Sequence, residues 1–293
     1  MKTVGILGGL SPESTIKYYQ WLNDGVRQHL GGHHSAKILL SSVDFGQFVA
    51  LKEKGDWETQ GRLLAAEAAA LEKAGADFII LATNTMHKMA DQIESAISIP
   101  FLHLADATAH KIIEQGIKKI GLLGTRYTME LDFYKGRLER KGLDVIVPDD
   151  NGRNSVNNII YDELCHGKVT DTSRQAYREI IAQLIDQGAE GVIMGCTEIT
   201  MLIDQSDSAA PLFDTTKIHV EKALEEIFSA PDTHNQTDNQ KHARKQKKMV
   251  PLRGFEPPTH ALRMRCSTPE LQRHKMIIDF YKKQNEISTR FVT

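Results

Sequence analysis

The apolar positions of residues 1–231 form short continuous runs that alternate with longer amphipathic segments. Continuous apolar runs between turn residues are typical of parallel strands buried on both faces, and apolar residues at helical spacing predict the covering helices. We therefore predict an α/β fold with parallel sheets. A helix from Lys217 to Phe228 is expected to pack back on the first half of the chain. The strands are expected at residues 3–8, 37–43, 78–82, 100–103, 119–124, 143–147, 191–195 and 211–213.

This pattern occurs twice. The first half opens with residues 4–9 and the second with residues 120–125, each a short apolar run that ends in a glycine turn. Later in each half, an amphipathic helix is followed by a glycine (Gly75 or Gly188), an apolar run and a polar cluster. Glycine is favoured just beyond a helix because it adopts positive φ readily. The matching order and spacing indicate an internal duplication.

The duplication predicts two pseudo-symmetric, flavodoxin-like domains with parallel sheets. We place the first at residues 1–105 together with 212–230, and the second at residues 106–211. Ligands of such sheets bind beyond the carboxyl ends of the strands. Two halves that face each other would set the turn at Thr83 opposite the turn at Cys196. We therefore expect one active site between the domains.

Composition and charge exclude several classes of partner. The formal net charge is −2 at pH 7, which gives no reason to expect a nucleic-acid partner. No apolar run approaches the ~18 residues of a membrane-spanning helix, so no membrane partner is expected. The 3 cysteines of the chain form no disulfide framework, and their scarcity favours a cytoplasmic protein.

Residues 232–293 differ in composition from the rest of the chain. Basic residues outnumber acidic ones in this segment, whereas acidic residues predominate before it. Its first part has no apolar periodicity, and its second part is rich in Pro, Arg and His. One interpretation is a basic arm for nucleic acid or acidic surfaces. We favour a disordered extension without a function of its own.

Two polar clusters carry the candidate chemistry: Thr-Asn-Thr at residues 83–85 and Cys-Thr-Glu at residues 196–198. Both follow a predicted strand and are expected to open a helix. Helix N-termini bind carboxylates and lower the pKa of a thiol, so Cys196 is expected to form a thiolate base for a carbon acid. Helix capping is the alternative role for the hydroxyl and amide side chains.

Glu198 and His87 are candidates to support this chemistry, although His87 fits a core or helix-surface position equally well. No cofactor is expected. The glycines at residues 5–9 lack the full dinucleotide fingerprint, and no cysteine or histidine spacing fits zinc. No lysine is placed to indicate pyridoxal phosphate.

Together these residues resemble the aspartate/glutamate racemase family. The matching stretches are residues 5–9, 83–87, 121–125 and 195–198, and they run through nearly all of residues 1–230. The resemblance implies a cofactor-independent isomerase with two pseudo-symmetric domains, a catalytic cysteine in each, and commonly a homodimer. Its substrate would be an acidic amino acid, aspartate or glutamate.

One position departs from that pattern, because Thr83 stands where the family has its first catalytic cysteine. The resemblance is closest to the subgroup that carries Thr here and acts on L-aspartate and L-glutamate. A hydroxyl is a far weaker acid than a thiol, so it can donate a proton to a carbanion but is not a resting base. We expect Cys196 to remove the α-proton of the L-enantiomer and Thr83 to protonate the opposite face.

The resemblance also implies a set of substrate-binding residues. Asn84, Thr85 and Thr197 would bind the substrate carboxylates. Lys52 occupies the matching position in the loop after the second strand, and Leu10 lies in the matching first turn.

Two other functions stay open at this point. A single-cysteine decarboxylase or isomerase of the same superfamily needs only one proton donor, and an apolar pocket would favour it. A catalytically weak amino-acid-binding protein would bind L-aspartate without exchanging its α-proton. Cys165 is interpreted as structural, with a position near the cleft as the alternative. Asp106, Lys168 and Arg126 are charges that the sequence does not place relative to the cleft.

Overall fold

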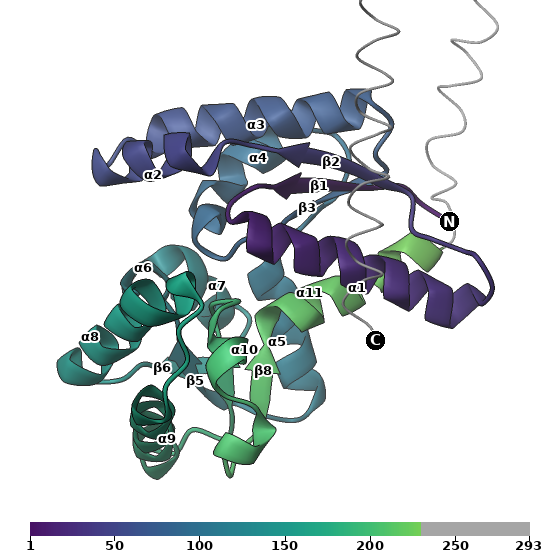
Figure 1. The fold of residues 1–293 in the computed structure, drawn as a ribbon. Coiled ribbons are helices and arrows are strands. Elements are labelled where there is room, and N and C mark those ends of the chain that lie inside the picture. Colours follow the sequence, from purple (N-terminus) through teal and green to yellow (C-terminus); the bar gives the residue numbers. More distant parts are fainter. Residues whose placement is uncertain (230–293) are drawn as a thin grey trace, which may run out of the picture. The chain divides into compact units, whose positions relative to one another are not determined.

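The computed structural model describes residues 1–229, which contain two parallel four-stranded sheets (Figure 1). The strand order is the same in both sheets, which confirms the duplicated α/β architecture. Each expected strand is present, most with shorter ends. The first sheet has the order β2 (Ile38–Ser42), β1 (Val4–Gly8), β3 (Phe78–Leu81) and β4 (Phe101–Leu102). The second has the order β6 (Asp144–Ile146), β5 (Lys119–Leu123), β7 (Val192–Met194) and β8 (Leu212–Asp214).

Helices cover both faces of the first sheet, with α3 on one side and α1 on the other in Figure 1. Side chains alternate along a strand, so β1 directs Leu7 to one face and Ile6 to the other. The Leu7 face is covered by α2 (Phe45–Glu53), α3 (Trp57–Lys73) and α4 (Ala90–Ala96). The Ile6 face is covered by α1 (Pro12–Leu30) and α11 (Thr215–Phe228).

The second sheet is covered in the same way. One face packs against α5 (Leu104–Glu114) and α7 (Asp132–Arg140), and the other against α8 (Asp150–Asn158) and α9 (Asp171–Asp186). The short elements are α6 (Arg126–Glu130), α10 (Ile199–Leu202), the 3-10 helices η1 (Thr85–Met89), η3 (Leu164–His166) and η4 (Gln205–Asp207), and the π-helix η2 (Ile159–Glu163).

Local sequence explains where the helices begin and end. Helix α1 starts directly after β1, because Ser11 accepts a hydrogen bond from the Ser14 amide and Pro12 occupies the first turn. The equivalent helices α3 and α9 are followed by Gly75 with φ 100° and Gly188 with φ 95°, as the sequence predicts. The first turn of α1 therefore lies at the carboxyl edge of the first sheet.

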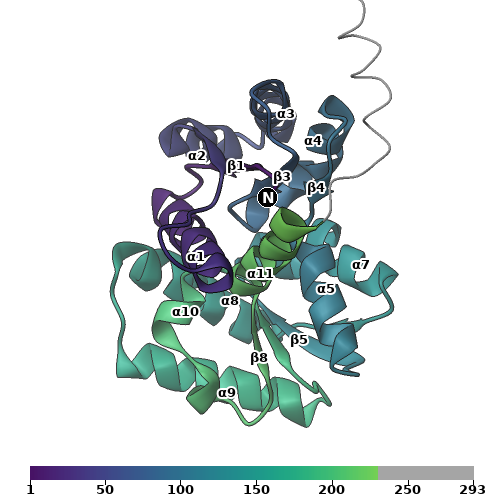
Figure 2. The ribbon, with the colours of Figure 1, turned by 90° about the vertical axis from the view of Figure 1, so that its right-hand side faces the viewer.

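Helix α11 joins the two halves. It follows β8 of the second sheet, yet its residues Val220, Ala223 and Ile227 share a buried cluster with Val4 and Ile6 of β1. Figure 2 shows it between α1 and α5. This arrangement confirms that the chain returns to its first half. Within residues 1–229, no helix is long and apolar enough to span a membrane. The basic segment 232–293 lies outside the described residues.

Candidate active site

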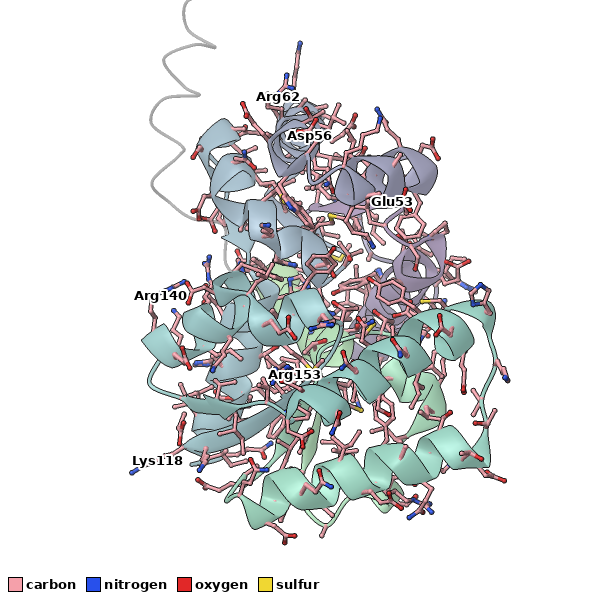
Figure 3. The ribbon with its side chains drawn as sticks, turned by 90° about the vertical axis from the view of Figure 1, so that its left-hand side faces the viewer. Glu53, Asp56, Arg62, Lys118, Arg140 and Arg153 are labelled. Carbon is pink, nitrogen blue, oxygen red and sulfur yellow. The ribbon has the colours of Figure 1, made fainter. Side chains whose placement is uncertain are left out.

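A cavity of about 520 Å³ lies at the carboxyl ends of β1, β3 and β7 and is lined by side chains from both halves. Figure 3 shows side chains filling the space between the halves, with Glu53 labelled on α2 of the first and Arg153 on α8 of the second. The cavity brings together eight of the nine candidate residues from the sequence. These are Leu10, Lys52, Thr83, Asn84, Thr85, Cys196, Thr197 and Glu198.

The thiol of Cys196 donates a hydrogen bond to Glu198, with 2.9 Å between Sγ and Oε2. Burial raises the pKa of this thiol well above its usual value, and the negative charge of Glu198 raises it further. The expectation of a thiolate at rest is therefore wrong. Helix α10 has only 4 residues and begins at Ile199, so the helix terminus does not outweigh these two effects.

His87 binds the backbone of the Thr83 turn. The Nδ1–H group of His87 donates to the Thr83 carbonyl at 2.7 Å, and its Nε2 accepts from the Leu104 amide at 3.2 Å. The Leu104 amide can only donate, so Nε2 carries no proton and the ring is neutral. Burial lowers the pKa of His87 well below its usual value. His87 does not line the cavity and supports the site through the backbone of Thr83.

The polar residues beside Thr83 and Cys196 do not cap helices. No side-chain capping bond is formed at the start of η1 or of α10. The Asn84 amide instead donates to Thr215, and the Thr197 hydroxyl lies 3.3 Å from that of Thr216 and 3.2 Å from that of Ser14. Thr197 therefore connects the second half to α1 and α11, and Asn84 is held by α11.

Two lysines supply positive charge to the cavity. Lys52 Nζ donates to Tyr161 Oη at 3.4 Å and lies 5.1 Å from the centre of the Tyr161 ring and 5.8 Å from that of Tyr127. Its pKa is lowered by partial burial. Lys17 on α1 donates to the Thr197 carbonyl at 3.4 Å. Such cations, beside hydroxyl and amide donors, fit an anionic ligand.

Sequence reasoning missed several residues that line the cavity. Glu13 and Lys17 are four residues apart, on one side of the helix that begins at the carboxyl end of β1. That spacing next to the first glycine turn was a usable signal. Tyr161 and Cys165 come from η2 and η3, and only the tertiary structure brings them to the cavity. Cys165, interpreted as structural from sequence, is an exposed lining residue.

The other charges considered from sequence lie outside this cavity. Asp106 accepts two hydrogen bonds from Arg137, at 3.0 and 2.8 Å. Arg126 lines a neighbouring pocket that shares Lys52 and Tyr161 with the cavity. Lys168 lines neither of the two. Within residues 1–229, no group of three or more His, Cys, Asp or Glu side chains is arranged to hold a metal ion.

Comparison with known proteins gives the chain a family. The sequence profile described as Asp/Glu/Hydantoin racemase matches residues 7–223. A crystal structure of a candidate Asp/Glu racemase from Yersinia pestis is 55% identical, with a TM-score of 0.76, and the match covers 78% of this chain and 100% of that one.

Two further relatives agree with this assignment. An aspartate racemase homologue from Pyrococcus horikoshii OT3 is 36% identical, with a TM-score of 0.71 and coverage of 78% and 100% of the two chains. The broad specificity amino-acid racemase RacX of Bacillus subtilis (strain 168) is 27% identical over 221 residues, which are 73% of this chain and 92% of RacX. The chain described here belongs to the Asp/Glu/hydantoin racemase family, a family of amino-acid isomerases.

Proposed function

We propose that this protein racemises aspartate and glutamate by transferring protons on both faces of Cα without a cofactor. The observation that carries the proposal is that Thr83 and Cys196 line one cavity from opposite halves. Racemisation needs one proton removed from Cα and another delivered to the opposite face. A thiol and a hydroxyl on two sides of a small carbon acid meet that requirement.

The charges of the cavity favour a dicarboxylic amino acid. Lys17 and Lys52 can each pair with a carboxylate, and Thr85 and the second Nδ2 hydrogen of Asn84 offer further hydrogen-bond donors. The Thr197 hydroxyl proton is used on Ser14, so this side chain takes part through its oxygen. Glu13 can receive the α-ammonium group. This lining differs from the apolar pocket that would favour a decarboxylase of malonate-type acids. It supports an acidic amino acid as the substrate.

The Cys196–Glu198 hydrogen bond indicates how a protonated thiol becomes a base. When substrate binds, the thiol proton moves along this bond to Glu198, and the resulting thiolate removes the α-proton of the L-enantiomer. The Thr83 hydroxyl then donates its proton to the opposite face of the carbanion. Water restores the proton of Thr83 and takes the extra proton from Glu198, so the enzyme returns to its starting state.

The test follows α-proton exchange and inversion in the full chain without added cofactor. Incubation in D₂O with L-aspartate or L-glutamate and a chelator is expected to replace the α-hydrogen with deuterium, seen by NMR, and to form the D-enantiomer, seen by chiral separation. Absence of both changes for both substrates would contradict the proposal. Release of CO₂ from a substituted malonate would instead indicate a decarboxylase. Saturable binding of L-aspartate without exchange would indicate a binding protein.

The expected homodimer and cytoplasmic location stay predictions, as do the domain boundaries at residues 105 and 212.

A further inference from the structure

A buried hydroxyl contacts both turns of the candidate site. Thr215, at the first position of α11, is 0% exposed. Its hydroxyl donates to the Met194 carbonyl at 3.0 Å and accepts from Asn84 Nδ2 at 3.4 Å. Asn84 follows Thr83 directly, and Met194 lies two residues before Cys196. One side chain therefore joins the segment that carries the proposed proton donor to the segment that carries the proposed base.

The direction of these bonds fixes the orientation of the Asn84 amide. A carbonyl can only accept, so the single hydrogen of the Thr215 hydroxyl is used on Met194. Asn84 must then turn its NH₂ group toward Thr215. Its Oδ1 is buried and has no hydrogen-bond partner within residues 1–229. Because Thr215 binds the NH₂ group of Asn84, the Oδ1 atom of this cavity-lining amide stays available to accept a hydrogen bond.

Ser14 forms a second bridge between the same turns. Its hydroxyl donates to the carbonyl of Ala82, which precedes Thr83, at 3.0 Å. The Ser14 oxygen lies 3.2 Å from Thr197 Oγ1. Because the proton of Ser14 is used on Ala82, the Thr197 hydroxyl is the donor in this second contact. Ser14 and Thr215 come from different helices, so the turns are joined independently by α1 and α11.

We propose that Thr215 and Ser14 are positioning residues that hold the Thr83 and Cys196 turns at a fixed separation. This inference rests on the proposed racemase function. Proton transfer requires the reacting atoms to lie about 3–3.5 Å apart, and a shift of about 1 Å can reduce a rate about 100-fold. If the two turns move apart, the carbanion lasts longer before Thr83 protonates the opposite face. The Cys196 thiol then has time to exchange its proton with solvent and to return a solvent-derived proton to the original face. Exchange with retention then gains over inversion.

The experiment measures that partition in the full chain. L-Aspartate is incubated in D₂O, and the rate of α-deuteration of the remaining L-aspartate is divided by the rate of D-aspartate formation. Thr215→Val keeps the side-chain shape and removes the hydroxyl, and the ratio is expected to rise at least about tenfold. Thr215→Ser keeps the hydroxyl and should restore the wild-type ratio.

Thr108→Val is the matched control. Thr108 is also 0% exposed and its hydroxyl also donates to a backbone carbonyl, that of Leu104, but it bonds neither the Thr83 turn nor the Cys196 turn. The ratio measured for Thr108→Val should equal the wild-type ratio. A change seen only in Thr215→Val then reports positioning of the turns and not a general loss of stability. Circular dichroism and thermal unfolding show whether each variant is folded.

An unchanged ratio in folded Thr215→Val would overturn the inference. If that variant does not fold, Ser14→Ala provides the same test through the second bridge, and an unchanged ratio there would equally overturn it. Failure of the proposed function has a different signature, because the wild-type chain would then show neither exchange nor inversion of L-aspartate or L-glutamate.

Discussion

The Thr83 turn and the Cys196 turn follow equivalent strands, β3 and β7, yet they present groups of very different acidity to one cavity. Behind Thr83, a neutral histidine binds the backbone carbonyl, and among residues 1–229 the Thr83 hydroxyl has no charged hydrogen-bond partner. Beside Cys196, a carboxylate accepts a hydrogen bond from the thiol itself. In the proposed reaction, the duplicated fold provides two opposed positions, and the side chain next to each one, His87 or Glu198, makes them chemically different.

Removing the Cys196 thiol should abolish the difference between the two turns and have the largest effect on activity. Cys196→Ala leaves no group to remove the α-proton of the L-enantiomer, so exchange into L-aspartate should fall at least about 100-fold, within the range for loss of a general base. NMR in D₂O measures the remaining α-hydrogen signal. Retained exchange in a folded variant would show that Cys196 is not the base.

Removing the Glu198 carboxylate beside the thiol should have the second-largest effect on activity. Glu198→Gln eliminates the acceptor of the thiol proton, and racemisation near pH 7 should fall about 100-fold. It also removes the negative charge that raises the pKa of Cys196, so this pKa should be lower than in the wild type. Activity of the variant should then increase with pH as the thiolate forms.

The rate of iodoacetamide alkylation against pH, with Cys165 and Cys266 replaced by Ser in both proteins, reports the Cys196 pKa directly. Glu13→Gln is the matched control, because Glu13 lines the cavity but forms no hydrogen bond with Cys196. Equal alkylation midpoints for the Glu198→Gln and parent proteins would refute the assigned electrostatic role.

Placing a cysteine in both turns makes them chemically alike and should change activity less than the two substitutions above. Thr83→Cys replaces a weak acid with a thiol that can also act as a base, so kcat from D- to L-aspartate should rise about tenfold. Because the enantiomers have equal free energy, kcat/KM must stay equal in the two directions. A polarimetric assay from each enantiomer measures both quantities. No increase in the D-to-L kcat would mean that Thr83 does not limit that direction.

Lys52 should affect binding more than chemistry. Lys52→Gln removes a charge-assisted hydrogen bond to a substrate carboxylate, and KM for L-aspartate should increase about tenfold with a smaller change in kcat. Lys54→Gln is the matched control, since Lys54 ends the same helix but is exposed and does not line the cavity. An equal KM for the Lys52 variant and this control would remove Lys52 from the proposed site.

The smallest effect is expected from removing the basic segment at the end of the chain. Deletion of residues 232–293 should leave kcat, KM and the thermal unfolding midpoint unchanged, because every proposed catalytic and binding residue precedes this segment. Loss of activity or of folding in the truncated chain would contradict the interpretation of the segment as a non-functional extension.

The elements were predictable because their signals are local. Apolar runs encode strands, Gly75 and Gly188 end equivalent helices, and the repeat itself places Thr83 opposite Cys196. All of these are read from neighbouring residues or from spacing along the chain.

The pKa of Cys196 and the contacts between the halves were not predictable in the same way. The pKa of Cys196 depends on its burial and on a 2.9 Å contact with Glu198, and neither follows from the expectation that a helix begins there. Tyr161 meets Lys52 across more than 100 residues of chain, and such a contact exists only after the halves pack together.

The position of α11 has a consequence for how the chain folds during synthesis. The ribosome makes β1 and β3 early, but one face of their sheet is covered by Val220, Ala223 and Ile227. That apolar face cannot be covered by α11 until nearly the whole of residues 1–229 has emerged. The second sheet is complete only at Asp214, and its core includes Ile218 of the same helix. Neither half can therefore reach its final packing before α11 is made, in contrast to the usual order in which domains fold as they are made.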